Sequence, residues 1–338
     1  PALPRLDAAP RAGRRPPTRS EEAFWLERDR SGPGRASLYA VPVCAWLRPD
    51  ADAARLEAAV KAVVRAREAL RTRYVEEDGE RYAEPLDGDA AASACWSATE
   101  SDDAAAAVAA AAARTPEPFD GDGPLVFATL VTSGGVPRAL ALVFHHVAVD
   151  LWALEILLRD VADAYGGDAV RPETPGLLGA VAAWQRGPYA SSPRRDAAVA
   201  FWRDAFSRGD GGAATALDVS TDRPRPKRPT FRAGCAAAAL DDALVRAVAF
   251  GARQWRVSPL CVYASLWAAT LGRFASQRDV VVGVPGANRD GLGGAGDDLV
   301  ACCVNSLPLH VRLEDGADGP LTLAALCRRV GGALEAAR

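Results

Sequence analysis

The chain has 338 residues and a formal net charge of −3 at pH 7, with 49% apolar and 25% charged residues. This length predicts two domains of ordinary size or one large unit with two lobes, and the composition is typical of a soluble globular protein. The weak net charge argues against binding of nucleic acid or of an anionic membrane. The sequence shows neither a signal peptide nor the ~20 apolar residues that span a membrane, so we expect a cytoplasmic protein.

Basic and proline-rich residues open the chain, and residues 1–19 are expected to form a flexible leader. Apolar residues at helical spacing in DADAARLEAAVKAVVRAREALRTRY predict a helix across residues 50–74, capped by Asp50 or Asp52. The alanine-rich run at 104–113 predicts a further helix.

Two strands are predicted where LVFATLVTS (125–133) and RALALVFHH (138–146) flank a Gly-Gly turn. The stretch LWALEILLRDVADAYGG (151–167) predicts a helix with one apolar stripe that ends at Gly-Gly. Polar, Gly/Pro-rich connectors at 186–196 and 207–229 follow, and they indicate a crossover between two halves.

The second half again mixes helices and strands. Helices are predicted over about 240–275, a buried strand at 279–285, an alternating strand that begins before Leu307, and a last helix from near Leu321. Interleaved strands and helices in both halves predict a mixed α/β protein.

The seven cysteines are scattered, odd in number and mostly embedded in apolar segments. They form no CxxC or Cys/His spacing, so a metal site is not expected. We interpret them as small buried apolar residues in a reducing compartment.

Two of the three histidines, His145 and His146, stand side by side at the end of the second predicted strand. Strand ends that lead into a loop and a helix are common positions for catalytic side chains. Because successive strand residues point to opposite faces, one imidazole should be buried as support while the other projects. A neutral imidazole can accept a proton from an amine or an alcohol. Since the chain has no GxSxG elbow or reactive cysteine context, we expect an external nucleophile.

HHVAVDLW, at residues 145–152, resembles the HHxxxDG motif of the condensation domains of nonribosomal peptide synthetases, which belong to the chloramphenicol-acetyltransferase-like superfamily. The resemblance continues in the family's order along residues 18–338. The other similar segments are TRSEEAFWLERD, AREALRTRY, EPFDGDGPL, VAAWQ, STDRPRP, VVVGVPGANRD and LVACCVNSLPLHVRL. The chain is therefore identified as a member of this family.

The resemblance implies two chloramphenicol-acetyltransferase-like lobes that form a V with a tunnel at their interface. The N-terminal lobe would occupy residues 20–185, and the C-terminal lobe, including the crossover, residues 186–338. The last strands and helix of the family's second lobe would lie beyond Arg338. The family's activity would be a condensation-type acyl transfer.

In that activity a donor acyl or peptidyl chain, held as a phosphopantetheine thioester on one carrier protein, is joined to an amine or hydroxyl acceptor. The acceptor is bound to a second carrier protein or is a free small molecule, and an amide or ester forms in nonribosomal peptide or hybrid polyketide biosynthesis, a source of antibiotics. The resemblance implies a monomer that binds no metal and no cofactor of its own, since the carrier proteins' phosphopantetheine arms bring the substrates.

The family pattern also implies roles for single residues. His146 would lie at the tunnel centre and deprotonate or position the nucleophile, with His145 as its buried support. Asp150 would be structural and pair with Arg289, and Arg71 would be a further structural cation; removing one partner of a buried pair costs ~3–5 kcal/mol. The residues expected to line the tunnel are Leu151, Trp152 and Asn305.

Several positions depart from the family pattern. Leu151 replaces the glycine that follows the aspartate, and leucine lacks the conformational freedom of glycine. Glu21 replaces a glutamine, and Cys303 stands where an aromatic residue is common. These departures suggest a divergent member with a nonstandard donor or acceptor.

Three alternatives stay open. A coenzyme A-dependent HxxxD acyltransferase of the plant type would carry a DFGWG motif, which we do not find up to Arg338. An epimerase would carry a glutamate-bearing signature in the second half, which we do not identify. A degenerate domain that only recruits another enzyme is favoured by Leu151 and opposed by the intact His146 and Asp150.

Two further features have ordinary interpretations. GLGGAGDD (291–298) lacks the GxxxxGK[ST] pattern, so we expect a mobile loop near the tunnel mouth and not a phosphate site. His310 shares the polar face of its predicted strand with Ser306 and Arg312, and we expect it to be a solvated surface residue.

Overall fold

The computed structural model describes residues 6, 13–31, 36–119, 121, 123–207, 216–227, 230–231, 233–315 and 320–337. The chain divides into two compact units. The first, which we call the histidine unit, contains Ala2–Ser192 and Ala287–Val304. The second, which we call the C-terminal unit, contains Pro193–Gly286 and Asn305–Arg338.

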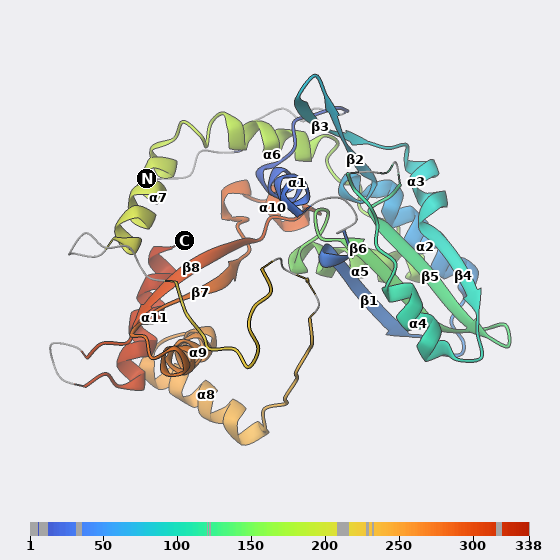
Figure 1. Ribbon diagram of the computed structural model, residues 1–338. Helices are drawn as coiled ribbons and strands as arrows, with labels where there is room; N and C mark the ends of the chain where they lie inside the picture. Colours follow the sequence, from blue (N-terminus) through green and yellow to red (C-terminus); the bar gives the residue numbers. More distant parts are fainter. Residues whose placement is uncertain are drawn as a thin grey trace. The chain divides into compact units, whose positions relative to one another are not determined.

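A mixed sheet forms the centre of the histidine unit, with strand order β1-β6-β5-β4 (Figure 1). Its strands are β1 (Ala40–Trp46), β4 (Trp96–Glu100), β5 (Val126–Ser133) and β6 (Val136–His145). β4 runs parallel to β5, and the other neighbours are antiparallel. The predicted pair of strands is confirmed: β5 and β6 join at Gly134 and Gly135, which both have positive φ. A separate hairpin consists of β2 (Thr72–Glu77) and β3 (Glu80–Pro85).

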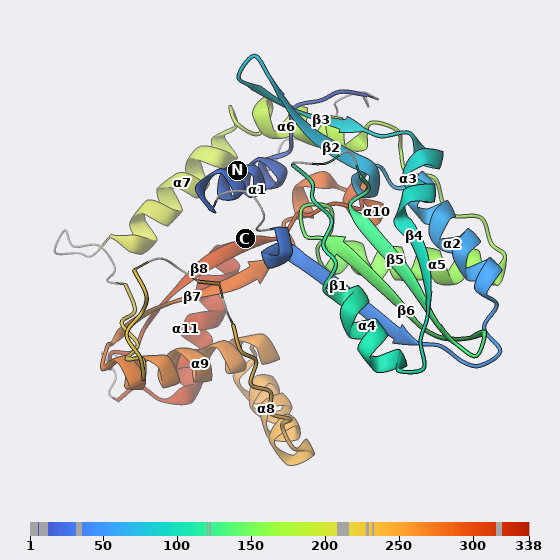
Figure 2. The same cartoon turned by 45° about the vertical axis from the view of Figure 1, so that its right-hand side comes forward.

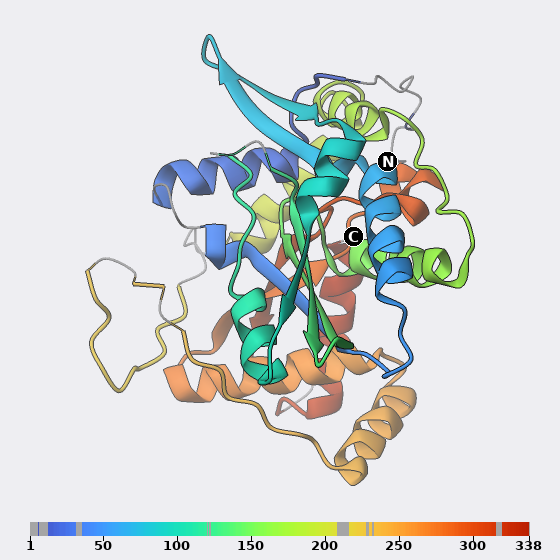
Figure 3. The same ribbon diagram turned by 90° about the vertical axis from the view of Figure 1, so that its right-hand side faces the viewer.

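Helices cover both faces of this sheet. The helices of the histidine unit are α1 (Arg19–Ser31), α2 (Ala53–Ala66), α3 (Gly88–Cys95), α4 (Ala104–Ala112), α5 (Leu151–Gly166), α6 (Leu177–Arg186) and α10 (Ala295–Asp298). Leu140 and Phe144 of β6 pack into a core that also contains Val60 of α2 and Leu157 of α5. The alanine-rich α4 lies on the opposite face (Figure 3). On that face Arg114 stacks over the Phe127 ring.

The predicted helix over residues 50–74 is too long. Asp52 caps α2 as expected, but the helix ends at Ala66, where Arg67 takes an extended backbone with φ −108° and ψ 107°. A short 3₁₀ turn follows, and Thr72 opens strand β2. Strand β2 pairs with β3 along its whole length. β-branched and aromatic residues such as Thr72 and Tyr74 favour a strand once a partner is present.

The C-terminal unit is built on a two-stranded antiparallel ribbon of β7 (Asp279–Gly286) and β8 (Asn305–Arg312). Its helices are α7 (Pro193–Phe206), α8 (Asp242–Trp255), α9 (Pro259–Ala275) and α11 (Leu323–Ala336). Alternate ribbon residues such as Val280 and Leu309 share a core with Ala268 of α9 and Leu326 of α11 (Figure 2). The predicted strands and helices of this half are present, with small shifts at their ends.

The two units differ in two places from the lobes predicted over residues 20–185 and 186–338. Their first boundary lies at Ser192, after α6 has ended. In addition, residues 287–304 belong to the histidine unit because Arg289 is paired there.

The flexible leader expected over residues 1–19 lies largely outside the described residues, but its last part is packed. Arg15 bridges to Ala83 of β3, with main-chain N–O distances of 3.0 and 2.8 Å, and is buried. No helix within the described ranges is long and apolar enough to cross a membrane.

Candidate active site

The two neighbouring histidines lie where β6 ends. The main-chain N–H of His145 donates to the Leu125 carbonyl at 3.0 Å, and that of His146 donates to the Tyr39 carbonyl at 2.8 Å. The backbone is therefore held on both sides as it leaves the sheet. The side chains divide as strand alternation predicts: His145 is 1% exposed, and His146 is only partly buried.

His145 is a neutral, buried support. Its Nδ1 accepts a hydrogen bond from the Val147 main-chain N–H at 3.1 Å, so the ring proton is on Nε2. The rings of Phe24, Tyr39 and Phe119 surround it, with centroids 6.0 to 6.2 Å away. Burial lowers the pKa of His145 to about 3, and the neighbouring His146 adds to the shift. His145 is thus unsuited to proton transfer near neutral pH.

His146 keeps its ring at the edge of the packed region. The ring lies 5.7 Å from that of Phe24, and Nδ1 lies 3.6 Å from the Cys302 sulfur. Nε2 makes no hydrogen bond with the residues that the structure describes, so it is the ring nitrogen left without a protein partner.

Asp150 is fully engaged by the protein. Its Oδ1 accepts from the Ala153 main-chain N–H at 2.8 Å, which caps α5. The expected ion pair is present: Arg289 Nη2 donates to both carboxylate oxygens, at 2.9 and 3.1 Å. The main-chain N–H of Cys303 donates to Oδ2 at 2.9 Å. With four hydrogen bonds from three donor nitrogens, Asp150 is a structural residue that ties the loop after His146 to the segment 287–304.

Arg289 completes this connection from the other side. It is 7% exposed and donates to three main-chain carbonyls. These are the carbonyls of Gly296, Leu299 and Ala301, at 2.9, 2.7 and 3.1 Å. Residues 291–298, expected to be a mobile loop, are therefore held by this guanidinium and include the short helix α10. The buried charge has both an anion and carbonyl dipoles to stabilise it.

The three residues expected to line a tunnel differ in their placement. Leu151 is the first residue of α5 and is 75% exposed, so the leucine needs no unusual backbone angle in place of glycine. Trp152 is 44% exposed and donates from Nε1 to the Asp297 carbonyl at 3.3 Å. Asn305 is the exposed first residue of β8 and belongs to the C-terminal unit.

Arg71 does not support the histidine loop. Its guanidinium donates to the main-chain carbonyls of Arg65 and Leu86, at 3.2 and 2.7 Å, and so holds the corner between α2 and β3.

A cation that does support this region besides Arg289 is Arg67, to which the sequence assigned no role in the site. It is 1% exposed and donates to Asp160 of α5 from Nε at 2.9 Å and from Nη2 at 2.6 Å. Its Nη1 reaches the Asp298 carbonyl at 3.4 Å. Arg67 therefore joins α2, α5 and the segment 287–304. A single arginine at a helix end carries no sequence signal for such a role.

A third buried ionic pair contains Glu21, at the position where the family has glutamine. Arg15 donates to both its oxygens, at 2.7 and 2.8 Å, and Tyr74 donates its hydroxyl at 3.0 Å. Burial would raise the pKa of Glu21, but Arg15 outweighs that effect and lowers it. A buried carboxylate needs a cation as its partner. Because that partner, Arg15, falls in the segment expected to be a flexible leader, the sequence did not reveal the pair.

The prediction of buried cysteines is wrong for Cys44 and Cys235, which are exposed, but five of the seven are buried as predicted, among them Cys302 and Cys303. Burial raises the pKa of both thiols, that of Cys303 to about 11, and the Asp150 carboxylate adds to the shift at Cys302. Both are therefore neutral thiols and poor nucleophiles. Their place beside His146 and Asp150 was not predicted.

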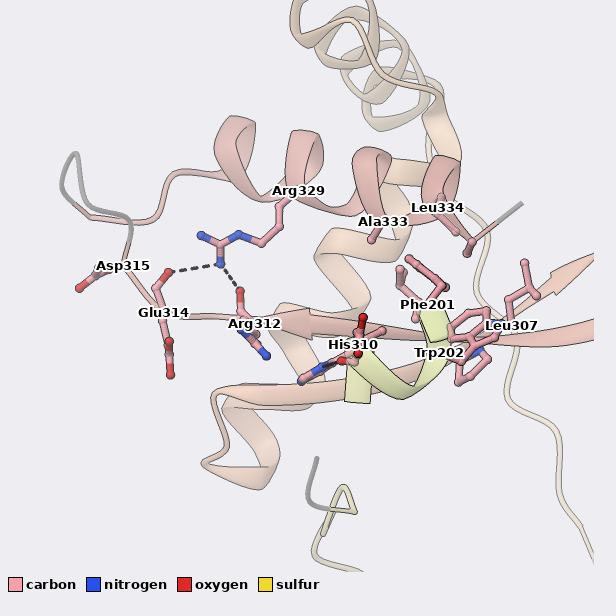
Figure 4. Close-up of a pocket in the computed structure, with 15 residues that line it drawn as sticks. Phe201, Trp202, Leu307, His310, Arg312, Glu314, Asp315, Arg329, Ala333 and Leu334 are labelled. Atoms are coloured by element: carbon pink, nitrogen blue, oxygen red, sulfur yellow. Dashed lines mark hydrogen bonds between the residues drawn. The ribbon is translucent and has the colours of Figure 1, made fainter. Parts of the chain in front are cut away.

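The prediction for His310 is wrong. Its side chain is only 7% exposed, Nε2 lies 3.0 Å from Asp279 Oδ1, and its ring stacks on Phe206. Helix α7, which the strand pattern could not place, covers it. A pocket of about 650 Å³ opens beside it in the C-terminal unit (Figure 4). Labelled pocket residues include Phe201, Trp202, Leu307, Arg312, Glu314 and Arg329.

The parts of the chain that the structure describes hold no cluster of three or more side chains suited to bind a metal ion. The chemistry available at the histidine loop is thus that of one accessible imidazole, two neutral buried thiols and a fully paired carboxylate.

Comparison with protein families gives one match over most of the chain. The model of the family described as Condensation domain matches residues 33–338. A probable non-canonical nonribosomal peptide synthetase, CymA, from Salinispora arenicola is 31% identical over 98% of this chain, which covers 4% of that protein. Phosphinothricin tripeptide synthetase PhsC from Streptomyces viridochromogenes is 29% identical over 88% of the chain, which covers 27% of it.

Solved structures share the fold. The condensation domain of the monacolin K polyketide synthase MokA superimposes with a TM-score of 0.76 at 16% identity, over 97% of this chain and 74% of that one. The X-domain from teicoplanin biosynthesis, solved in complex with OxyB, gives 0.79 at 24% identity, over 100% of this chain and 73% of that one. At these identities the likeness establishes the mixed α/β, chloramphenicol-acetyltransferase-like fold.

Proposed function

Because this chain belongs to the condensation domain family, we propose that it transfers an acyl or peptidyl group from a carrier-protein thioester to an amine or hydroxyl acceptor. As a member of that family the chain is an acyltransferase. The donor is held on a phosphopantetheine arm, and the acceptor is held on a second carrier protein or is free. The product is an amide or an ester of a nonribosomal peptide or a hybrid polyketide.

The reaction needs no group from the protein to become covalently attached. The lone pair of the acceptor nitrogen or oxygen attacks the thioester carbonyl carbon, and negative charge collects on the carbonyl oxygen. The carbon–sulfur bond then breaks, and the proton lost by the acceptor ends on the released thiol of the phosphopantetheine arm. A polar group placed at the reacting atoms accelerates such a step by assisting the proton or by stabilising the oxyanion.

His146 is the group that we assign to the reacting atoms. The observation that carries this assignment is the contrast within the motif: His145 and Asp150 are buried and bonded to the protein, whereas His146 leaves Nε2 open. His145 and Asp150 are positioning residues, because each acts through the backbone that holds His146. The intact arrangement supports an active enzyme over a degenerate recruitment domain.

The test is an acyl-transfer assay with a donor-loaded carrier protein and a panel of amine and alcohol acceptors. We expect product with at least one acceptor, and a loss of about 10²-fold or more in His146→Ala. His310→Gln, which changes the third histidine in the other unit, is the control and should retain activity. Far-ultraviolet circular dichroism of each variant checks that the fold is intact.

Each other outcome has a distinct meaning. Equal rates for wild type and His146→Ala would remove the histidine from the mechanism. Product from an acyl-coenzyme A donor, and none from the loaded carrier protein, would overturn the choice of donor. No product with any donor, together with tight binding of another biosynthetic enzyme, would overturn the proposed activity.

A further inference from the structure

The Cys302 thiol touches the imidazole of His146, with Sγ 3.6 Å from Nδ1. A thiol is a weak donor through its S–H and a weak acceptor through its sulfur, and a neutral imidazole has one nitrogen of each kind. The proton between the two atoms therefore belongs either to sulfur or to nitrogen. If sulfur holds it, the neutral imidazole carries its own proton on Nε2, and Nε2 is a donor. If Nδ1 holds it, Nε2 has no proton and is an acceptor.

The surroundings of the sulfur assign that proton. Cys302 is 6% exposed, and a thiol in such surroundings stays protonated. Among the residues that the structure describes, His146 Nδ1 is the atom with a lone pair placed to receive the S–H.

The thiol is also held in place by its neighbours in the chain. The carbonyl of Ala301 accepts from Arg289 at 3.1 Å, and the N–H of Cys303 donates to Asp150 at 2.9 Å. Both residues that flank Cys302 are thus bonded to the same buried ion pair. The ring of Phe24 lies on His146 as well, with its centroid 5.7 Å away. The imidazole is therefore set between an anchored thiol and an aromatic ring.

We propose that Cys302 is a positioning residue that donates its S–H to Nδ1 of His146 and keeps the ring proton on Nε2. This inference rests on the proposed acyl transfer and specifies the role of its histidine. The N–H at Nε2 donates to the thioester oxygen as that atom becomes negative during attack, as an oxyanion donor does. In this tautomer the neutral ring is a hydrogen-bond donor and not the base that takes the acceptor's proton.

The tautomer can be read directly by NMR of the protein labelled with ¹⁵N-histidine. Three histidines give ring signals, and His146→Gln and His310→Gln assign them. In the wild type we expect the His146 signals of a ring protonated on Nε2, with Nδ1 shifted as a hydrogen-bond acceptor. Cys302→Ala should move the Nδ1 signal and raise the fraction protonated on Nδ1. Cys302→Ser, which keeps a donor at the same place, should restore the wild-type pattern.

Cys303→Ala is the matched control, because it removes the adjacent buried thiol and leaves the main-chain N–H that bonds to Asp150. We expect its His146 signals to stay where they are in the wild type. A wild-type ring protonated on Nδ1, or His146 signals that Cys302→Ala leaves unchanged, would overturn the proposal. These spectra need no substrate, so they test Cys302 whether or not the proposed reaction is correct.

The pH profile then tests the role in catalysis, with an alcohol acceptor whose own protonation does not change. A donor at Nε2 persists when the ring becomes charged, so kcat/KM should not fall as His146 is protonated. A general base would lose activity in that range. Loss of the S–H bond in Cys302→Ala should lower kcat about threefold to tenfold with little change in KM, and serine should recover it. An acidic loss of activity that follows protonation of His146 in the NMR spectra would overturn the donor role.

Discussion

Arg289 and Asp150 are 139 positions apart in the sequence, yet the guanidinium of one donates to both carboxylate oxygens of the other, at 2.9 and 3.1 Å. Both side chains are at least 93% buried. The pair fastens the loop that carries His146 to a segment from the second half of the chain. Because each charge is shielded from water, each depends on its partner.

Removal of one charge from this pair should destabilise the fold strongly. Asp150→Asn leaves the Arg289 charge buried without its anion, and we expect a loss of ~3–5 kcal/mol in the free energy of unfolding. Urea denaturation followed by circular dichroism measures it. The control is Asp298→Asn, which breaks an exposed pair with Arg159 and should cost about 0–1 kcal/mol. Equal losses for both variants would show that burial of the Asp150 pair is energetically unimportant.

Arg67 and Arg71 are four residues apart and should differ sharply. Arg67→Ala leaves Asp160 charged and buried, with an expected loss of ~3–5 kcal/mol in unfolding free energy. Arg71→Ala removes two hydrogen bonds to carbonyls from a half-buried side chain, and ~1–3 kcal/mol is expected. Chemical denaturation of the two variants side by side decides the order. A larger loss for Arg71→Ala would contradict the structure.

Gly272 lies where α9 packs on the β7–β8 ribbon. A Cβ at this position would lie 2.3 Å from Leu313 Cδ1 and 2.8 Å from the Gln277 carbonyl oxygen. The leucine can turn away, but the main-chain oxygen cannot, so Gly272→Ala should cost ~1–3 kcal/mol through overpacking. Gly332→Ala, in the nearby helix α11 where a Cβ meets nothing within 4 Å, should instead stabilise by ~0.5–1 kcal/mol. Thermal unfolding should shift in opposite directions for the two variants.

His145 should make stability depend on pH. Its pKa is about 3 in the folded protein against 6.5 for an exposed imidazole, so between these values the unfolded chain binds more protons. Its contribution to stability is complete above pH 6.5 and is lost as the pH falls toward 3. From pH 7 to pH 5 the loss should be about 2 kcal/mol, at 1.36 kcal/mol per pKa unit. Urea denaturation at both pH values measures it as a difference: the unfolding free energy of the wild type relative to His145→Gln should fall by this amount from pH 7 to pH 5.

A second buried group acts with the opposite sign and must be separated from the first. Burial raises the pKa of Glu173 from 4.5 to about 7, so the folded protein binds more protons than the unfolded chain in that range and gains stability as the pH falls. Urea denaturation of Glu173→Gln at both pH values isolates the contribution of Glu173 to the pH dependence of the unfolding free energy. If His145→Gln has the same pH dependence as the wild type, the buried neutral imidazole makes no contribution.

Local patterns predicted much of the fold. The alternation and the Gly-Gly turn that predict β5 and β6 agree with the structure, as do the Asp52 cap of α2 and the apolar stripe of α5. The family motifs extended the prediction to the site. The Asp150–Arg289 pair and the two histidines all lie in short motif segments, so the resemblance could place them.

Other features depend on contacts between distant residues. The helix over residues 50–74 ends early because Arg67 must turn toward Asp160, and no local signal distinguishes it from Arg71. Cys302 reaches His146 because its neighbours are bonded to Asp150 and Arg289, which a single sequence does not show. His310 is covered by α7, whose docking on β8 is likewise a tertiary contact.

Residues 287–304 belong to the histidine unit, whose other residues end at Ser192. On a translating ribosome the cation for Asp150, 139 residues further along the chain, would therefore appear roughly 7–28 s after the histidine loop, at synthesis rates of about 5–20 residues per second. Until then a nascent chain holds an unmatched carboxylate at the start of α5. Chimaeras that exchange the first 192 residues between relatives would inherit the same mismatch unless residues 287–304 come from the same parent.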